Sequence, residues 1–118
     1  LQPHEAGDER VCELVNRHQT TDKGFGAALG PAAGAKAARL FSELGYRVHT
    51  APSDWHIGPD ARVMQEALLG GWLAAAVATA PEHAVALQDW ARRRRAHVGA
   101  GRCRLSVGHI DLIGWPAR

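Results

Sequence analysis

The strands are the feature that most constrains how this chain can fold, because hydrophobic alternation predicts only two of them. Residues 46–51 alternate apolar and polar side chains, and residues 104–115 form the second run. The other periodic segments predict helices at residues 8–19, 31–44, 59–79 and 81–99. Two strands make a poor sheet by themselves. The order helix, helix, strand, helix, helix, strand therefore indicates an α/β chain that supplies only part of its sheet.

The helix predicted at residues 31–44 has the clearest boundaries. Pro31 takes the first helical position after Gly30, and Gly45 follows the helix as its C-cap. Four apolar residues form one stripe at helical spacing: Ala37, Leu40, Phe41 and Leu44. We expect this helix to pack antiparallel to the strand at residues 46–51.

The final strand changes its apolar phase near Gly108. Leu105 and Val107 share one phase, whereas Ile110 and Leu112 share the other. Such a shift predicts either a β-bulge or a strand that is covered on both faces.

Composition places the chain among ordinary globular proteins. Of its 118 residues, 46% are apolar and 22% are charged, and a net charge of +2 does not by itself imply a polyanionic partner. The two cysteines form no CxxC pair, which favours a reduced, cytoplasmic setting. The seven histidines show no metal-ligand spacing, so we expect no metal. No signal peptide is visible, and without an initiator Met we expect the natural start to lie upstream.

Several short motifs carry a resemblance to a known family. They are NRHQ at residues 16–19, DKGFG at 22–26, ALGP at 28–31, GYRV at 45–48, SDW at 53–55, LLGGW at 68–72 and VGHIDL at 107–112. Together they resemble proteobacterial class I methyltransferases that depend on S-adenosylmethionine (SAM), in the part that follows the fifth strand of the catalytic sheet. The resemblance runs nearly the whole length of the chain.

The resemblance implies the C-terminal part of a Rossmann-like sheet, with strands in the order 3-2-1-4-5-7-6 and strand 7 antiparallel. Residues 46–51 would be strand 6 and residues 104–115 strand 7. The whole chain, 1–118, would be one partial domain with a helical lid inserted at residues 59–101. The family binds SAM after its first two strands, so the cofactor would be held mainly by an N-terminal half. This chain would then contribute no cofactor residue and be inactive by itself.

A glycine-rich stretch at residues 24–30 superficially resembles a nucleotide-binding loop. Such loops follow a strand, whereas this one follows a helix and has the wrong spacing. A flexible turn that leads into a helix is the alternative we prefer.

The expected topology locates the functional face. Ligands of open α/β sheets lie beyond the carboxyl ends of the parallel strands. Residues 52–56 follow the strand at 46–51, so they lie at that end, as do residues 1–5, the loop before the second helix and the start of the final strand. We expect these segments to converge around the substrate.

The first group of candidate residues lies at and after the end of the first helix. His18 is either a general base for methyl transfer or a surface histidine at a helix end. Asp22 and Lys23 either bind substrate or are a turn cap and a solvated charge. Phe25 lines either the substrate pocket or the core.

The second group follows the strand at 46–51. Trp55, beside Asp54 and His56, forms either a pocket wall with polar handles or an aromatic cover for the strand edge. His109, in the last strand, fits a hydrogen-bonded sheet histidine better than a catalytic one.

Four consecutive arginines, residues 92–95, support a different function. They point around most of a helix circumference, which favours a solvated helix over one basic stripe. The alternative is a non-enzymatic module that contacts nucleic acid or an acidic partner through the helix at 82–99.

Strand 7 would lose its neighbour, strand 5, in this chain. An apolar strand with an unpaired edge is a template for pairing with another chain. We therefore expect a homodimer or higher oligomer that pairs through residues 104–115.

Overall fold

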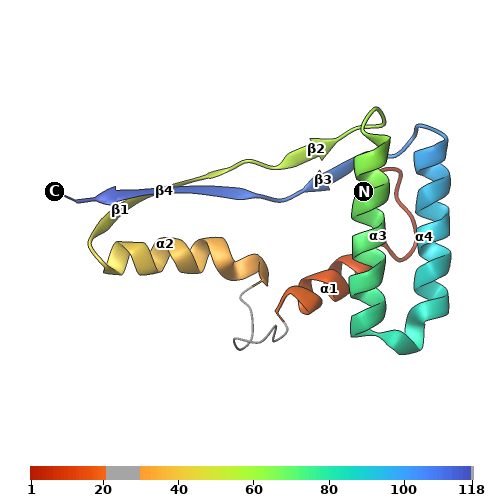
Figure 1. Cartoon of the computed structure of the whole chain (residues 1–118), viewed down its shortest axis with the longest axis horizontal. Helices are drawn as coiled ribbons and strands as arrows, with labels where there is room; N and C mark the ends of the chain where they lie inside the picture. The colour runs from red at the N-terminus through yellow and green to blue at the C-terminus, as the bar shows by residue number, and fades with distance from the viewer. Residues whose placement is uncertain (21–29, 118) are drawn as a thin grey trace.

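A computed structural model describes residues 1–20 and 30–117 of the chain. It is a mixed α/β structure with four α-helices and two small antiparallel sheets. Figure 1 shows two parts that differ in character: helices α1, α3 and α4 gather at one end, and a long β-ribbon with α2 beneath it extends from them. We call the first part the helical body and the second the ribbon arm.

The helical body contains the hydrophobic core. Its helices are α1 (Asp8–Gln19), α3 (Arg62–Thr79) and α4 (Ala84–Gly99), and α3 packs against both of the others. Each presents a buried face at helical spacing, as Val11 and Leu14 do on α1. Trp90 of α4, only 1% exposed, is the largest side chain at the centre. A short 3-10 helix, η2 (Pro81–His83), begins at a proline and connects α3 to α4.

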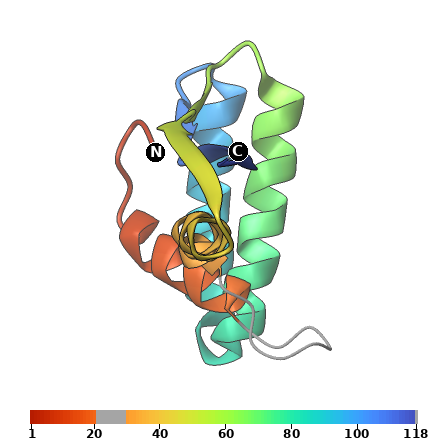
Figure 2. The ribbon, with the colours of Figure 1, turned by 90° about the vertical axis from the view of Figure 1, so that its left-hand side faces the viewer.

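The ribbon arm consists of β1 (Tyr46–Pro52), β4 (Ile110–Pro116) and α2 (Ala33–Glu43), which follows the 3-10 helix η1 (Gly30–Ala32). Strands β1 and β4 pair antiparallel, and α2 packs on one face of the pair. Figure 2 looks along the arm and shows α2 end-on. The predicted antiparallel pairing of residues 46–51 with the last strand is therefore confirmed.

The last predicted strand is divided in two. Strand β3 (Leu105–Val107) pairs with β2 (Trp55–Ile57), a strand that the sequence analysis assigned to a loop. Pro52 pairs with Ile110 and Trp55 pairs with Val107. Two residues on each side of the ribbon therefore separate the two ladders, and the register does not change. The predicted bulge is therefore wrong, because a bulge would add a residue to one strand only.

The phase shift has a different cause. In an antiparallel ribbon with unbroken register, side chains of opposite parity lie on opposite faces. Leu105, 1% exposed, is covered by the helical body, whereas Ile110 lies on the other face, where its side chain is near Gly34 of α2. The apolar pattern changes phase because the covering layer changes sides. The predicted cover on both faces is also wrong, since no residue of β4 is buried.

The ribbon arm is poorly covered. Neither α2, β1 nor β4 contains a buried residue. The stripe predicted to pack against the strand stays open at Leu40, Phe41 and Leu44, of which Leu44 is 75% exposed. On the ribbon, Ile113 is 63% and Trp115 45% exposed. The radius of gyration is 17.2 Å, against about 13–14 Å for a compact domain of this length. The ribbon arm is therefore much less well packed than the helical body.

The helix predictions hold with small changes at the ends. The first helix begins and ends where the sequence predicted, at Asp8–Gln19. The helices predicted from Pro31 and Pro81 begin as 3-10 turns and become α-helical at Ala33 and Ala84. In α3 the first helical residue is Arg62 instead of Pro59.

Candidate functional site

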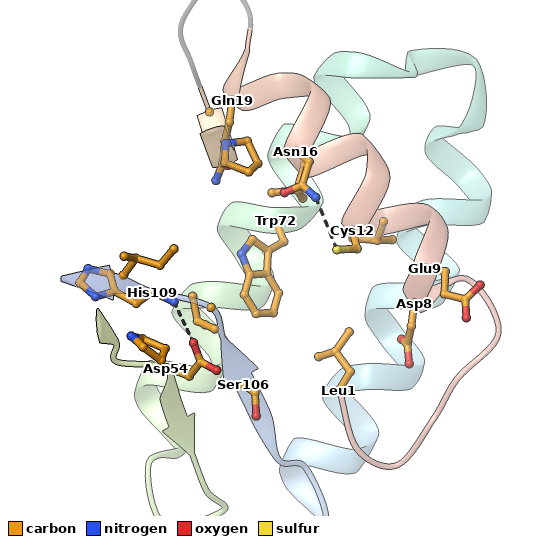
Figure 3. Close-up of a pocket in the computed structure, with 18 of the residues that line it drawn as sticks. Leu1, Asp8, Glu9, Cys12, Asn16, Gln19, Asp54, Trp72, Ser106 and His109 are labelled. Atoms are coloured by element: carbon orange, nitrogen blue, oxygen red, sulfur yellow. Dashed lines mark hydrogen bonds between the residues drawn. The ribbon is translucent and has the colours of Figure 1, made fainter. Parts of the chain in front are cut away.

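A cavity of about 990 Å³ lies where the helical body meets the ribbon arm. Its walls come from the first residues of the chain, α1, the start of α2, the gap in the ribbon and Trp72 of α3 (Figure 3). This volume is in the range of small-molecule sites. The described residues that line it are Leu1, His4, Asp8, Glu9, Val11, Cys12, Val15, Asn16, Gln19, Gly30, Pro31, Gly34, Pro52, Asp54, Trp72, Ser106, Val107, Gly108, His109 and Ile110.

One wall is a face of α1. Asp8, Cys12 and Asn16 are each four residues apart, which places them one above the other on a helix. The Asn16 amide nitrogen donates to the Cys12 sulfur at 3.8 Å, and Cys12 is exposed. Leu14, on the opposite side of α1, is completely buried in the core, and Val11 and Val15 lie beside the polar stripe and also line the cavity. Amphipathicity therefore orients the polar stripe of α1 toward the cavity.

The carboxylate of Asp8 is fully engaged by the protein. One oxygen accepts a hydrogen bond from the Trp90 indole nitrogen at 2.7 Å, and the other accepts from the Glu5 backbone N–H at 2.9 Å. A guanidinium nitrogen of Arg94 lies 3.7 Å from the second oxygen. Asp8 is 7% exposed. It therefore joins the first residues of the chain to α4 and is not available as a charged group in the cavity.

The second polar wall is the gap in the ribbon. Here the Ser53 N–H donates to the His109 carbonyl at 2.8 Å, and the His109 N–H donates to the Asp54 carboxylate at 3.1 Å. A side-chain oxygen thus replaces the missing backbone acceptor of the ladder. Figure 3 shows the Asp54 carboxylate on the cavity side of the ribbon and the His109 ring directed away from the centre of the cavity.

The His109 ring belongs to a cluster outside the cavity. Its Nδ1 lies 2.7 Å from the Ser53 hydroxyl and 3.4 Å from an Asp111 carboxylate oxygen, and the ring stacks on Trp55 at a centroid distance of 5.5 Å. A catalytic triad needs serine and aspartate at opposite ring nitrogens. Here both meet Nδ1, so the arrangement is not a triad. His109 is hydrogen-bonded, as the sequence analysis favoured, but it lies in the gap between β3 and β4 instead of in a strand.

The structure places the candidate residues in different environments. Of Asp54, Trp55 and His56, only Asp54 lines the cavity; Trp55 covers His109 at the ribbon surface, and the Nδ1 of His56 lies 3.2 Å from the Ser106 hydroxyl. His18 is half-buried on α1 and is not among the lining residues. The predictions for Asp22, Lys23 and Phe25 concern positions outside the described residues.

The sequence analysis missed the cavity face of α1 and Trp72. The polar spacing of Asp8, Cys12 and Asn16 was the available signal for the first. Trp72 lies within the helix predicted at residues 59–79, and an aromatic residue in a helix does not by itself distinguish a cavity wall from a packed core.

The four arginines are mostly engaged within the chain. Arg92 forms an ion pair with Asp89, and Arg93 forms ion pairs with Asp89 and Glu5. Arg94 is completely buried and donates to the carbonyls of Gln2 and Pro3. The prediction of a solvated helix is therefore wrong at Arg94. A nucleic-acid interface loses the continuous basic surface on which it would depend.

Glu5 anchors the first residues of the chain to α4. Its carboxylate lies 2.6 Å from the His97 Nε2 and 3.3 Å from the Arg93 Nε. The hydrogen bond from His97 holds the pKa of Glu5 below its ordinary value; burial opposes this, and Arg93 adds to the lowering. Leu1 and His4 are thereby held at the rim of the cavity.

No group of three or more His, Cys, Asp or Glu side chains within residues 1–20 and 30–117 is placed to hold a metal ion. No single described helix is long and apolar enough to cross a membrane, and α3 and α4 meet that requirement only as a pair bent by 119°. The chain matches no protein-family model, no curated protein and no solved structure.

Proposed function

We propose that this chain is the C-terminal, substrate-side segment of a SAM-dependent methyltransferase, which transfers a methyl group to its acceptor when joined to an N-terminal half. The observation that supports this proposal most strongly is the ribbon arm: an antiparallel strand pair with a helix on one face, a bare opposite face and, among the described residues, an unpaired outer edge on each strand. Strands 6 and 7 of a class I methyltransferase sheet would have this arrangement if strand 5 were removed.

In the proposed strand order the edge of β1 is the natural end of the sheet, and strand 5 would pair with the outer edge of β4. Within the described residues β4 pairs with β1 alone, so its other row of N–H and C=O groups has no strand partner. The face opposite α2 exposes Ile113 and Trp115. A neighbouring strand with a covering helix would satisfy the edge and bury the face together. The proposed N-terminal half supplies both.

The cavity lies where such a fold binds its ligands. Strand β1 ends at Pro52, which lines the cavity. The cavity is also lined by Gly30, Pro31 and Gly34, at the start of the helical segment that precedes β1. Ligands of open α/β sheets bind beyond the carboxyl ends of the parallel strands. If β1 is parallel to the missing strands, the cavity is on the correct side to hold a methyl acceptor.

SAM would be bound mainly by the missing half. None of the described strands leads through a glycine-rich turn into a helix, which is the arrangement that receives a nucleotide-like cofactor. The chain would therefore supply the acceptor side only, with α3 and α4 as the lid expected at residues 59–101.

The test is to join the chain to the polypeptide encoded directly upstream and to measure transfer of isotope-labelled methyl from SAM to candidate acceptors. We expect transfer with the joined protein and none with the 118 residues alone. An upstream sequence without a glycine-rich strand-turn-helix unit, or a joined protein that does not bind SAM, would refute the proposal. Asp54→Asn in the joined protein should reduce turnover, whereas Asp60→Asn, an exposed residue outside the cavity, should not.

The isolated chain has a second way to complete its sheet. We propose that it forms a homodimer in which β4 pairs antiparallel with its own copy, because a two-fold contact closes both open edges at once. This contact would occupy the surface that the N-terminal half covers in the joined protein.

A further inference from the structure

We propose that the cavity selects a small ligand with an ammonium group on an apolar body, and that the Asp54 carboxylate receives the charged end. The inference deepens the proposed function, because such a ligand would be the methyl acceptor. The inference rests on three observations: the sign of the charges that line the cavity, the position of Asp54 and the apolar walls around Asp54.

The charged side chains of the cavity wall are acidic. Asp8, Glu9 and Asp54 line it, whereas no Lys or Arg is among the lining residues that the structure describes. Asp8 is neutralised by Arg94 and two hydrogen bonds. Neither Glu9 nor Asp54 forms an ion pair with any described residue. A cleft that carries charge of one sign attracts ligands of the opposite sign.

Asp54 is the better placed of the two carboxylates. Its Oδ1 accepts the His109 N–H, which fixes the side chain against the ribbon. Figure 3 shows its carboxylate directed toward the cavity, and Glu9 at the outer rim beyond Asp8. Oδ2 accepts no hydrogen bond from the described residues, so it can accept one from a ligand. The backbone contact reduces the entropy cost of holding that oxygen in place.

The remaining walls fit an apolar body. Trp72 projects into the cavity from α3, and the other apolar lining side chains include Leu1, Val15 and Val107. Ammonium groups also bind favourably near indole rings. His4 and His109 also belong to the wall. Asp54 therefore presents a carboxylate oxygen beside apolar side chains, while Glu9 stays at the outer rim.

The proposed reaction is transfer of a methyl group to the nitrogen of the bound ligand. The bound ammonium group gives a proton to water and becomes a neutral amine. Its lone pair forms the N–CH₃ bond while the S–CH₃ bond of SAM breaks and its electron pair stays on sulfur. The products are the methylated ammonium ion and S-adenosylhomocysteine.

Cys12 provides a direct test, because it lines the cavity and is exposed while Cys103 is buried. Cys12 of the 118-residue chain is modified with a trimethylammonium-ethyl or a sulfonato-ethyl methanethiosulfonate, and the rate is read by peptide mass spectrometry. Rates are divided by those of the urea-unfolded chain, which removes the intrinsic difference between the reagents. We expect the cationic reagent to be favoured about tenfold.

Two variants and two indole compounds of opposite charge serve as further tests. Asp54→Asn keeps the oxygen that accepts the His109 N–H, so it should fold and should lose most of the cation preference, whereas Asp60→Asn should keep it. Tryptamine should slow the modification of Cys12, and indole-3-propionate, with a similar apolar body and the opposite charge, should not. Equal rates for the two reagents, equal protection by the two indoles, or an unchanged preference in Asp54→Asn would overturn the inference. The Cys12 modification assay contains no SAM, so its failure would overturn the ammonium site and leave the proposed methyl transfer to be judged by its own assay.

Discussion

Replacing Arg94 with alanine should destabilise the fold more than replacing any of the three neighbouring arginines. Its side chain is 0% exposed and lies between α4 and the first residues of the chain. It donates to the Gln2 carbonyl at 3.0 Å and also to the Pro3 carbonyl, and it lies 3.7 Å from the Asp8 carboxylate. Truncation removes all of these contacts and leaves a cavity.

The magnitude follows from these contacts. Hydrogen bonds from a charged donor contribute about 1.5–3 kcal/mol each, and removal of one partner from a buried ion pair costs about 3–5 kcal/mol. Two features reduce the loss: Asp8 keeps its hydrogen bonds from Trp90 and Glu5, and the Arg94 Nε, buried without a partner among the described residues, no longer needs to be desolvated. We therefore expect Arg94→Ala to lower the free energy of unfolding by about 3 kcal/mol.

The assay is urea unfolding followed by circular dichroism, with Arg95→Ala as the matched control. Arg95 is exposed on the same helix and should change stability by less than about 0.5 kcal/mol. Both variants change the helix propensity equally, so the difference between them reports burial. If the two variants unfold at the same urea concentration, the account of Arg94 as a buried link between α4 and the first residues is wrong.

Three further predictions concern other contacts. Gln65→Leu should cost about 3 kcal/mol, because the Gln65 amide donates to the buried carbonyls of Ile57 and Cys103 and to that of Gly58, whereas the exposed Gln88→Leu should cost little by the same urea assay. Because the pKa of Glu5 is lowered in the fold, its contribution to stability is present above the ordinary carboxyl pKa of 4.5 and is lost as the pH falls below that value. In unfolding curves measured at pH values above and below 4.5, the stability difference between the native chain and Glu5→Gln should therefore shrink on the acid side. Light scattering should give a molar mass of at least twice the 12.7 kDa of one chain, and Ile113→Lys on β4 should lower that mass toward the monomer value. A native chain that stays monomeric and folded would refute the dimer.

The local elements could be predicted where one pattern determined them. The first helix was correct at both ends, because Val11 and Leu14 mark a buried face and acidic residues begin the helix. Strand β2 was missed because it has only three residues and exists through pairing with β3, far along the chain. Short strands that depend on a distant partner leave no periodicity of their own.

The phase shift at Gly108 shows how a correct observation received the wrong cause. The alternation does change there, but no residue is inserted. Hydrophobic pattern reports which face is covered, and the cover moves from the helical body to α2 along the ribbon. Sequence alone does not distinguish this change of layer from a bulge.

The cavity was partly predictable from topology. The expectation was that residues 1–5, residues 52–56, the loop before the second helix and the start of the final strand converge. Members of the first, second and fourth segments line the cavity, whereas residues 21–29 of the loop lie outside the described residues. Its individual residues were harder to predict, because Trp55 and His56 lie in the same short strand and neither side chain reaches the cavity. Alternation in a strand predicts which face a side chain lies on, but it does not predict how far along the ribbon the cavity extends. Of residues 54–56 only Asp54, in the gap between the two ladders, lines the cavity.

The most direct test of the central claim is calorimetric titration of SAM into two proteins, the 118-residue chain and the same chain joined to the polypeptide encoded upstream. The proposed division of labour predicts a saturable, one-to-one isotherm for the joined protein and no saturable heat for the chain alone. Tight stoichiometric binding of SAM by the 118 residues alone would contradict it, because the cofactor site would then lie in the chain that we assign to the acceptor.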